Sequence, residues 1–203
     1  MDILCLDLEG VLVPEVWQAV ARSTGIEALT KTTRDIPDYD ELMRYRLNIL
    51  AEHDVALSTI QAQIELLAPL EGANEFLAQA GRDFQIAIIS DTFYEFAGPL
   101  MAQLDNPFLL CHKLVIENDR IVDYRIRQPD PKRCSVQAFK SLAYRVFAAG
   151  DSFNDVSMLE EADHGFFFCA PANVTAQYPQ YPLTADYDEL LSALHAAQAQ
   201  SQT

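Results

Sequence analysis

Short apolar runs alternate with amphipathic stretches along most of this 203-residue chain. The apolar runs predict strands at 3–8, 84–90, 108–116, 144–149 and 164–169. The amphipathic stretches outside 14–69 predict helices at 73–81, 93–104, 133–142, 154–162 and 186–198. Strands that alternate with helices form a parallel sheet covered on both faces. We therefore predict an α/β fold with a three-layer α/β/α, Rossmann-like core.

The segment from 14 to 69 has a different pattern, because it predicts helices only. These helices are expected at 14–29, 38–52 and 58–67, and the last begins with Ser58 and Gln61 in the spacing of a capping box. More than fifty residues of helix are too many for one crossover between strands. We therefore predict a small helical cap, 14–69, inserted into a core made of 1–13 and 70–203.

Charge and cysteine usage narrow the class of protein. The formal net charge is −16, which argues against nonspecific nucleic-acid binding, because such binding needs Lys and Arg to neutralise phosphates. The four cysteines are scattered and form no CxxC pair, as expected of a reduced compartment. The sequence begins without the pattern of a signal peptide and has no apolar run of about 20 residues. We expect a cytoplasmic protein that binds neither nucleic acid nor membrane.

Carboxylates gather at two predicted strand ends. Asp7 and Glu9 follow the first strand, and Asp151 and Asp155 follow the strand that ends at Gly150. The carboxyl ends of parallel strands meet at one edge of a sheet, so four carboxylates are expected to converge. Their mutual repulsion needs compensation, and a hard divalent cation with oxygen ligands provides it. The pattern indicates a magnesium enzyme that acts on an anionic substrate.

Simpler explanations exist for each group alone. Asp7 and Glu9 fit a solvated turn, and Asp151 with Asp155 fits a helix cap. Ser90 could equally be a hydroxyl-bearing residue at the end of a strand without a role in binding. The joint presence of both acidic groups favours the metal site over these alternatives.

The order of these residues resembles a known family. The segments 7–11 (Asp-Leu-Glu-Gly-Val), 88–90 (Ile-Ile-Ser) and 150–155 (Gly-Asp-Ser-Phe-Asn-Asp), together with Lys132, follow the four-motif order of the haloacid dehalogenase-like phosphatases. A helical insertion after the first motif matches the first cap class of that superfamily. Further positions are similar to the phosphoserine phosphatase branch, above all to bifunctional members that also transfer the phosphoryl group to homoserine. These positions are Glu15, Arg46, Asn154 and the run 90–93.

The resemblance implies roles for the acidic residues. Asp7 is expected to be the nucleophile that forms an aspartyl phosphate. Asp7, Asp151 and the backbone carbonyl of Glu9 are expected to hold Mg²⁺, with Asp155 orienting this set. The Glu9 side chain is expected to act as general acid and then as general base. The family usually has Asp at this position and Thr where this chain has Val11, and we hypothesise that both changes favour an alcohol over water as phosphoryl acceptor.

The resemblance also implies how a phosphorylated amino acid is bound. Ser90 and Lys132 are expected to bind phosphoryl oxygens, with Arg133 and Lys140 as rivals for the lysine role. Glu15 is expected to meet the α-ammonium group, and Arg46, with Arg44 as its rival, the carboxylate. Asn154 and Asp91 complete the expected substrate contacts. Asp91 replaces a glycine that is usual in this branch, and the sequence leaves open whether it acts through its backbone amide or its side chain.

We therefore predict a Mg²⁺-dependent phosphoserine phosphatase, with L-homoserine as a second acceptor. One alternative is a phosphatase of another small phosphorylated metabolite, and another is a phosphate-binding module without catalysis. A response-regulator receiver also phosphorylates a strand-end Asp, but the long insertion after the first strand disfavours it. The sequence leaves the oligomeric state open and is compatible with a homodimer.

Overall fold

The computed structural model describes residues 1–32, 35–36 and 38–200. Its seven-stranded sheet has the order β4-β3-β2-β1-β5-β6-β7, and all neighbouring strands are parallel except the antiparallel pair β3 and β4. The strands are β1 (Asp2–Leu6), β2 (Gln85–Phe93), β3 (Phe108–Glu117), β4 (Arg120–Arg125), β5 (Arg145–Gly150), β6 (His164–Phe168) and β7 (Leu183–Thr184). The predicted α/β fold is confirmed, and its sheet is parallel as predicted except for the edge strand β4.

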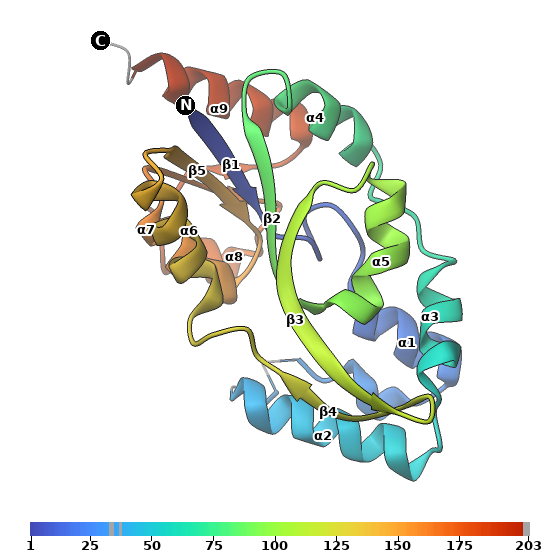
Figure 1. The fold of residues 1–203 in the computed structure, drawn as a ribbon. Helices are drawn as coiled ribbons and strands as arrows, with labels where there is room; N and C mark the ends of the chain where they lie inside the picture. The colour runs from blue at the N-terminus through green and yellow to red at the C-terminus, as the bar shows by residue number, and fades with distance from the viewer. Residues whose placement is uncertain (33–34, 37, 201–203) are drawn as a thin grey trace.

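Helices cover both faces of this sheet (Figure 1). On one side lie α4 (Ala73–Ala80), α5 (Tyr94–Gln103) and α9 (Tyr187–Gln200), and on the other lie α6 (Pro131–Ser141), α7 (Val156–Glu161) and α8 (Ala172–Thr175). Side chains of β1 alternate between the two layers: Leu4 and Leu6 join the apolar cluster of α4, α5 and α9, whereas Ile3 and Cys5 join that of α6 and α7. This alternation explains why the central strands are apolar throughout.

The segment between β1 and β2 is helical before α4, as expected from its pattern. It contains α1 (Val16–Thr24), the short 3₁₀ turn η1 (Glu27–Thr30), α2 (Tyr39–Glu52) and α3 (Leu57–Ile64). Buried side chains of this insert, among them Val20, Leu47 and Ile60, belong to the same apolar cluster as Leu4 and Leu6 of β1. The division of the chain into a core and a cap stays a prediction. No helix of the described residues is long and apolar enough to cross a membrane.

The sequence reading missed β4, the short strand β7 and the helix α8. The antiparallel partner β4 follows β3 after two residues, Asn118 and Asp119, whose φ angles are +49° and +63°. Two residues with positive φ make the tight turn that suits a hairpin, and Asn and Asp tolerate this conformation best after glycine. The turn signal was therefore present in the sequence. The hairpin brings β4 alongside α2 (Figure 1). Arg44 of α2 pairs there with Asp123 of β4 at 2.8 Å.

Ile60 of α3 tests whether the insert and the sheet unfold together. Its side chain is fully buried, so Ile60→Ala is expected to lower the free energy of unfolding by about 2–5 kcal/mol. Because the apolar cluster is continuous, chemical denaturation should give one shifted transition by tryptophan fluorescence and by far-UV circular dichroism. The exposed Thr59→Ala on the same helix serves as the control. Two separate transitions, of which only one shifts, would contradict a shared core.

Candidate active site

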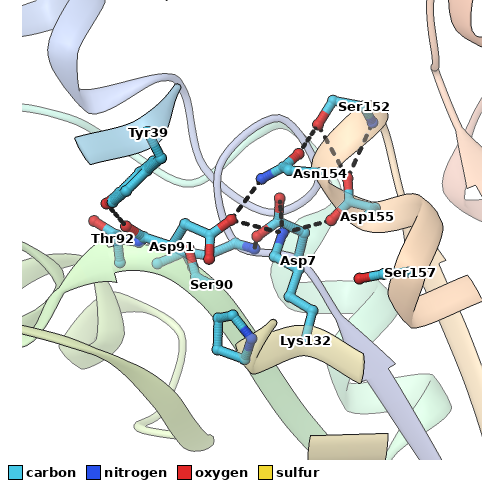
Figure 2. A network of polar contacts seen from close by, with 12 residues as sticks. Asp7, Tyr39, Ser90, Asp91, Thr92, Lys132, Ser152, Asn154, Asp155 and Ser157 are labelled. Carbon is cyan, nitrogen blue, oxygen red and sulfur yellow. Dashed lines mark hydrogen bonds and ion pairs between the residues drawn. The ribbon is translucent and has the colours of Figure 1, made fainter. Parts of the chain in front are cut away.

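Three neighbouring strands bring polar side chains to one edge of the sheet. Asp7 follows β1, Ser90 lies in β2, and Asp151 follows β5. β1 lies between the other two strands and is parallel to both, so the three residues meet at the carboxyl edge. Lys132 comes from the first turn of α6. Figure 2 shows Asp7, Ser90 and Lys132 in one group with Asp155.

The loop after β1 depends on Gly10. Its φ angle is +81°, a conformation that side chains other than glycine rarely adopt, and its N–H donates to the Val13 carbonyl at 2.8 Å. A Cβ atom at this position would lie 2.6 Å from Asp151 Oδ2. Glycine therefore lets the loop after Asp7 pass directly against the carboxylate that follows β5.

Three carboxylates form a compact cluster. Asp7, Asp151 and Asp155 each contribute one oxygen to a group whose members all lie within 4.8 Å of one another. Asp155 is fully buried, and its Oδ2 accepts from the backbone N–H groups of Asp151 and Ser152, each at 3.0 Å. These bonds fix the direction of the Asp155 carboxylate, while Gly150 leaves room for it, because a Cβ there would lie 2.3 Å from its Cγ.

The cluster carries unfavourable negative charge. Burial and the neighbouring Asp155 raise the pKa of Asp7 well above its usual value, and the same two causes raise the pKa of Asp151 to about 7. A cation placed among the three carboxylates would remove this penalty. A set of three hard carboxylate oxygens fits Mg²⁺. The Glu9 side chain is not part of this cluster, and the contribution of its backbone carbonyl to a metal site stays a prediction.

Lys132 supplies the positive charge inside the cluster. Its Nζ lies 2.5 Å from Asp155 Oδ1, 3.0 Å from Asp7 Oδ2 and 4.0 Å from Asp91 Oδ2, and the residue is 1% exposed. Burial alone would lower the pKa of Lys132, but the three carboxylates outweigh burial and raise it well above the usual value. Lys132 is therefore a buried cation at neutral pH.

The two rivals of Lys132 lie elsewhere. Arg133 pairs with Glu160 at 2.7 Å, and Lys140 pairs with Asp163 at 3.3 Å, on the outer side of α6 and α7. Among the described residues, no hydrogen bond or ion pair joins Arg133 or Lys140 to the carboxylate cluster. The structure thus brings only the first of the three candidate cations to Asp7.

Glu9 faces the insert. Its Oε2 accepts from the N–H of Val16, the first residue of α1, at 2.9 Å. Burial and the charge of Glu15 raise the pKa of Glu9 to about 7, so part of the population is protonated at neutral pH. A carboxyl group in this state is able both to give and to take a proton near pH 7.

A cavity of about 400 Å³ lies between the carboxyl edge of the sheet and the insert. Its wall includes every predicted site residue except Lys132 and Asp155, which are buried. The lining residues are Asp7, Glu9, Glu15, Trp17, Gln18, Thr32, Tyr39, Leu42, Arg46, Ser90, Asp91, Thr92, Asp151, Ser152 and Asn154. The insert and the sheet thus share one cavity, with both acidic and basic groups on its surface.

Arg46 is the basic group on the insert side. It is 7% exposed, its guanidinium carbon lies 4.5 Å from the centre of the Trp17 ring, and its Nη2 donates to the Lys31 carbonyl at 2.8 Å. Within the described part of the chain its buried Nε has no hydrogen-bond partner. The rival Arg44 instead pairs with Asp123 outside the cavity. Arg46 therefore keeps an unsatisfied donor next to the cavity.

Asp91 lies where several elements meet. Its Oδ2 accepts from Asn154 Nδ2 at 2.8 Å, its Oδ1 lies 3.6 Å from His112 Nε2, and its backbone carbonyl accepts from the Tyr39 hydroxyl at 2.8 Å (Figure 2). Burial would raise the pKa of Asp91, but Lys132, His112 and Asn154 together lower it to about 2. Asp91 is therefore ionised, and each of its carboxylate oxygens has a partner in the protein.

Sequence reasoning missed Tyr39, Thr92 and His112. Tyr39 is the first residue of α2 and carries no motif, so its contact with β2 follows only from how the insert packs. Thr92 belongs to the run 90–93, and the resemblance implies no role for it, but it lines the cavity. His112 is a lone histidine in a strand without metal-ligand spacing, and no local signal separates it from a core residue.

Comparisons with known proteins agree with this geometry. Residues 1–163 match the family model described as haloacid dehalogenase-like hydrolase. The chain is 60% identical over 191 residues to a phosphoserine phosphatase of Pseudomonas syringae pv. tomato, covering 94% of this chain and 81% of that protein. It is also 60% identical over 191 residues to phosphoserine phosphatase ThrH of Pseudomonas aeruginosa, covering 94% of this chain and 93% of the relative.

Solved structures share the fold. A substrate-bound phosphoserine phosphatase superposes with a TM-score of 0.80 at 20% identity, covering 95% of this chain and 98% of the other. A phospho-aspartyl intermediate analogue of phosphoserine phosphatase gives a TM-score of 0.78 at 19% identity, with 95% and 98% covered. The family match over most of the chain and the two relatives at 60% identity show that this chain belongs to the haloacid dehalogenase-like hydrolases.

Proposed function

We propose that this hydrolase removes the phosphoryl group from L-phosphoserine through an aspartyl phosphate on Asp7. The observation that carries the proposal is a single cavity with Asp7, backed by Lys132, at one side and the buried Arg46 at the other. A phosphorylated amino acid has an anionic group at each end. Arg46 in the cavity wall is the proposed partner of one, and Lys132, buried against Asp7, is the proposed partner of the other. The names of the two relatives at 60% identity support the same substrate.

Asp7 is the proposed nucleophile. One carboxylate oxygen attacks phosphorus, the phosphorus–oxygen bond to serine breaks, and the phosphoryl group becomes bound to Asp7. Asp7, Asp151, Asp155 and the Glu9 backbone carbonyl are the proposed holders of Mg²⁺. When bound, the ion would offset the charge of the carboxylates and of the phosphoryl oxygens. Ser90 and Lys132 bind phosphoryl oxygens, and Lys132 stabilises the charge that spreads over them during transfer.

Glu9 is the proposed acid and base. In the first step its carboxyl proton goes to the serine oxygen as that oxygen leaves. In the second step the carboxylate takes a proton from water while the water oxygen attacks phosphorus and the bond to Asp7 breaks. The contact between Glu9 Oε2 and the Val16 N–H holds the carboxyl group at the cavity wall and supports this role.

The insert supplies the proposed recognition of the amino acid. Arg46 binds the carboxylate through donors such as its unpartnered Nε, and Glu15 binds the α-ammonium group. Asn154 completes the wall on the side of β5. We propose that 14–69 acts as a cap on a core of 1–13 and 70–203, because these recognition groups come from 14–69 and the reacting groups from the core.

We further propose L-homoserine as a second phosphoryl acceptor. Homoserine has the same ammonium and carboxylate groups as serine and one additional methylene before its hydroxyl, so the same Arg46 and Glu15 pair suits it. Glu9 would take the proton of its hydroxyl as it takes that of water. This proposal rests on the sequence resemblance to bifunctional members of the family and on the ammonium and carboxylate groups that serine and homoserine share. A cytoplasmic location and a homodimer stay predictions.

Magnesium binding should be measurable without turnover. Because burial and mutual repulsion penalise the three carboxylates, millimolar Mg²⁺ is expected to raise the melting temperature of the wild-type protein. Removal of the metal with EDTA should reverse the rise and abolish phosphatase activity. Asp151→Asn should lose most of the Mg²⁺-dependent rise, whereas the control Asp163→Asn, which pairs with Lys140 away from the cluster, should keep it. An equal rise in both variants would contradict the proposed site.

Arg46→Ala tests the substrate. The loss of a buried cation that binds a carboxylate is expected to lower kcat/KM for L-phosphoserine roughly 30- to 150-fold. This corresponds to a loss of about 2–3 kcal/mol of transition-state stabilisation. Hydrolysis of p-nitrophenyl phosphate, which has no such carboxylate, should change far less. Arg44→Ala on the same helix is the control, because Arg44 lies outside the cavity. Equal losses on both substrates would favour a phosphatase of another small metabolite.

Phosphorus NMR tests the second acceptor. Wild-type protein with Mg²⁺, L-phosphoserine and L-homoserine should give phosphohomoserine beside free phosphate, and Asp7→Asn should give neither. Glu9→Asp should lower the ratio of transfer to hydrolysis several-fold, because the shorter acid is displaced from the acceptor. Free phosphate as the sole product of the wild type would reduce the proposal to a plain phosphatase.

A further inference from the structure

His112 is a buried titratable residue that the proposed mechanism does not use. It lies in β3, is 2% exposed and packs between the rings of Tyr39 and Phe93, whose centres lie 6.1 and 6.2 Å from its own. It does not line the cavity that contains Asp7. Any effect of His112 on the reaction must therefore pass through another residue.

The contacts of the ring define its direction. The backbone N–H of Arg127 donates to His112 Nδ1 at 3.3 Å, so a neutral ring carries its proton on Nε2. Nε2 faces Asp91 Oδ1 at 3.6 Å. The imidazole is thus held at Nδ1 by the loop that follows β4, and its Nε2 faces the carboxylate of Asp91.

The other oxygen of Asp91 acts on the active site. Oδ2 accepts from Asn154 Nδ2 at 2.8 Å and lies 4.0 Å from Lys132 Nζ (Figure 2). The amide oxygen of Asn154 accepts in turn from the Ser152 hydroxyl, so both ends of this amide are fixed. Removal of the Asp91 carboxylate would free one end of Asn154 and leave Lys132 with two carboxylates instead of three.

We propose that Asp91, oriented by His112, is a positioning residue that fixes Asn154 and Lys132 for phosphoryl transfer. Its carboxylate is committed to these partners and does not serve as a substrate acceptor. In this proposal the Asp91 side chain acts on other protein groups, and a substrate contact through its backbone amide stays a prediction. This inference rests on the proposed phosphatase function of the same site.

The test uses paired substitutions of His112. His112→Leu keeps an apolar side chain of similar size in β3 but removes the N–H, whereas His112→Gln retains an amide N–H near the position of Nε2. His112→Leu should lower kcat for L-phosphoserine roughly tenfold or more with KM changed less than about twofold, and His112→Gln should recover most of the loss. The exposed His53→Leu, at the end of α2, is the matched control.

A double-substitution cycle tests the route. Asp91→Ala should lower kcat at least as much as His112→Leu, and adding His112→Leu to Asp91→Ala should cause no further loss. If the fold-losses in kcat of the two single variants multiply in the double variant, His112 acts independently of Asp91. Equal losses in His112→Leu and His112→Gln would show that His112 acts only through packing. A raised KM with unchanged kcat in Asp91→Ala would show a direct substrate contact. Each of these results overturns the proposal.

A spectroscopic readout separates this inference from the proposed function. The side-chain amide resonances of Asn154, assigned with Asn154→Ala, should shift in Asp91→Ala and in His112→Leu but remain near the wild-type position in His112→Gln. If wild-type protein does not hydrolyse phosphoserine, the proposed function fails. The Asn154 resonances still decide whether His112 acts on Asn154 through Asp91. If His112→Leu does not fold, Asp91→Ala decides it, and unchanged Asn154 resonances there would overturn the proposal.

Discussion

The buried contact of Lys132 with Asp7 and Asp155 is the interaction on which the rest of the site depends. Separated from the ammonium group, either carboxylate would be an uncompensated charge in the interior, a loss that typically destabilises by several kcal/mol. The two aspartates follow β1 and β5, which are neighbours in the sheet, and the lysine is the second residue of α6. A sheet order that separated these strands would take Asp7 away from the pair of Lys132 and Asp155. The topology and the charge cluster therefore require each other.

Three hydrogen bonds near this cluster join the insert to the sheet and to the loop after β1. Glu9 receives the first N–H of α1, Tyr39 at the start of α2 donates to the Asp91 carbonyl, and the Leu70 N–H donates to the Leu12 carbonyl where the chain returns. An aspartate in place of Glu9 is shorter by one methylene, so on the same backbone its carboxylate would lie farther from the N–H of α1. The longer acid thus links the proposed proton donor to the helix that begins the insert, and any motion of α1 would move that donor.

The sequence allowed the strands, most helices and the strand-end acids to be predicted, because periodicity and the geometry of parallel sheets are local or general rules. It did not reveal β4, although Asn118 and Asp119 carried the turn signal, since a strand with arginines at both ends has a weak apolar pattern. Arg44 and Arg46 are only two positions apart, and their helix alone does not say which one lines the cavity. In the structure Arg46 lines it, whereas Arg44 pairs with Asp123 of the unpredicted strand β4. His112 is beyond local reasoning, because its partner Asp91 is 21 positions away and its role follows only from the distance between them.

The overall charge of −16 appears at odds with an anionic substrate, and the burial of the site groups resolves the conflict. Exposed charges are screened within about 10 Å at ordinary ionic strength, whereas buried charges act at short range with little screening. Lys132 and Arg46 are among the most buried charged residues of the described chain, at 1% and 7% exposure. Arg46 lines the cavity, and Lys132 contacts Asp7, which also lines it. Glu9, with a pKa near 7, is partly neutral there, and a cation among the three aspartates would cancel much of their charge. The buried Lys132 and Arg46 therefore act on an anionic substrate at short range, whereas solvent screens the charges of the acidic exterior.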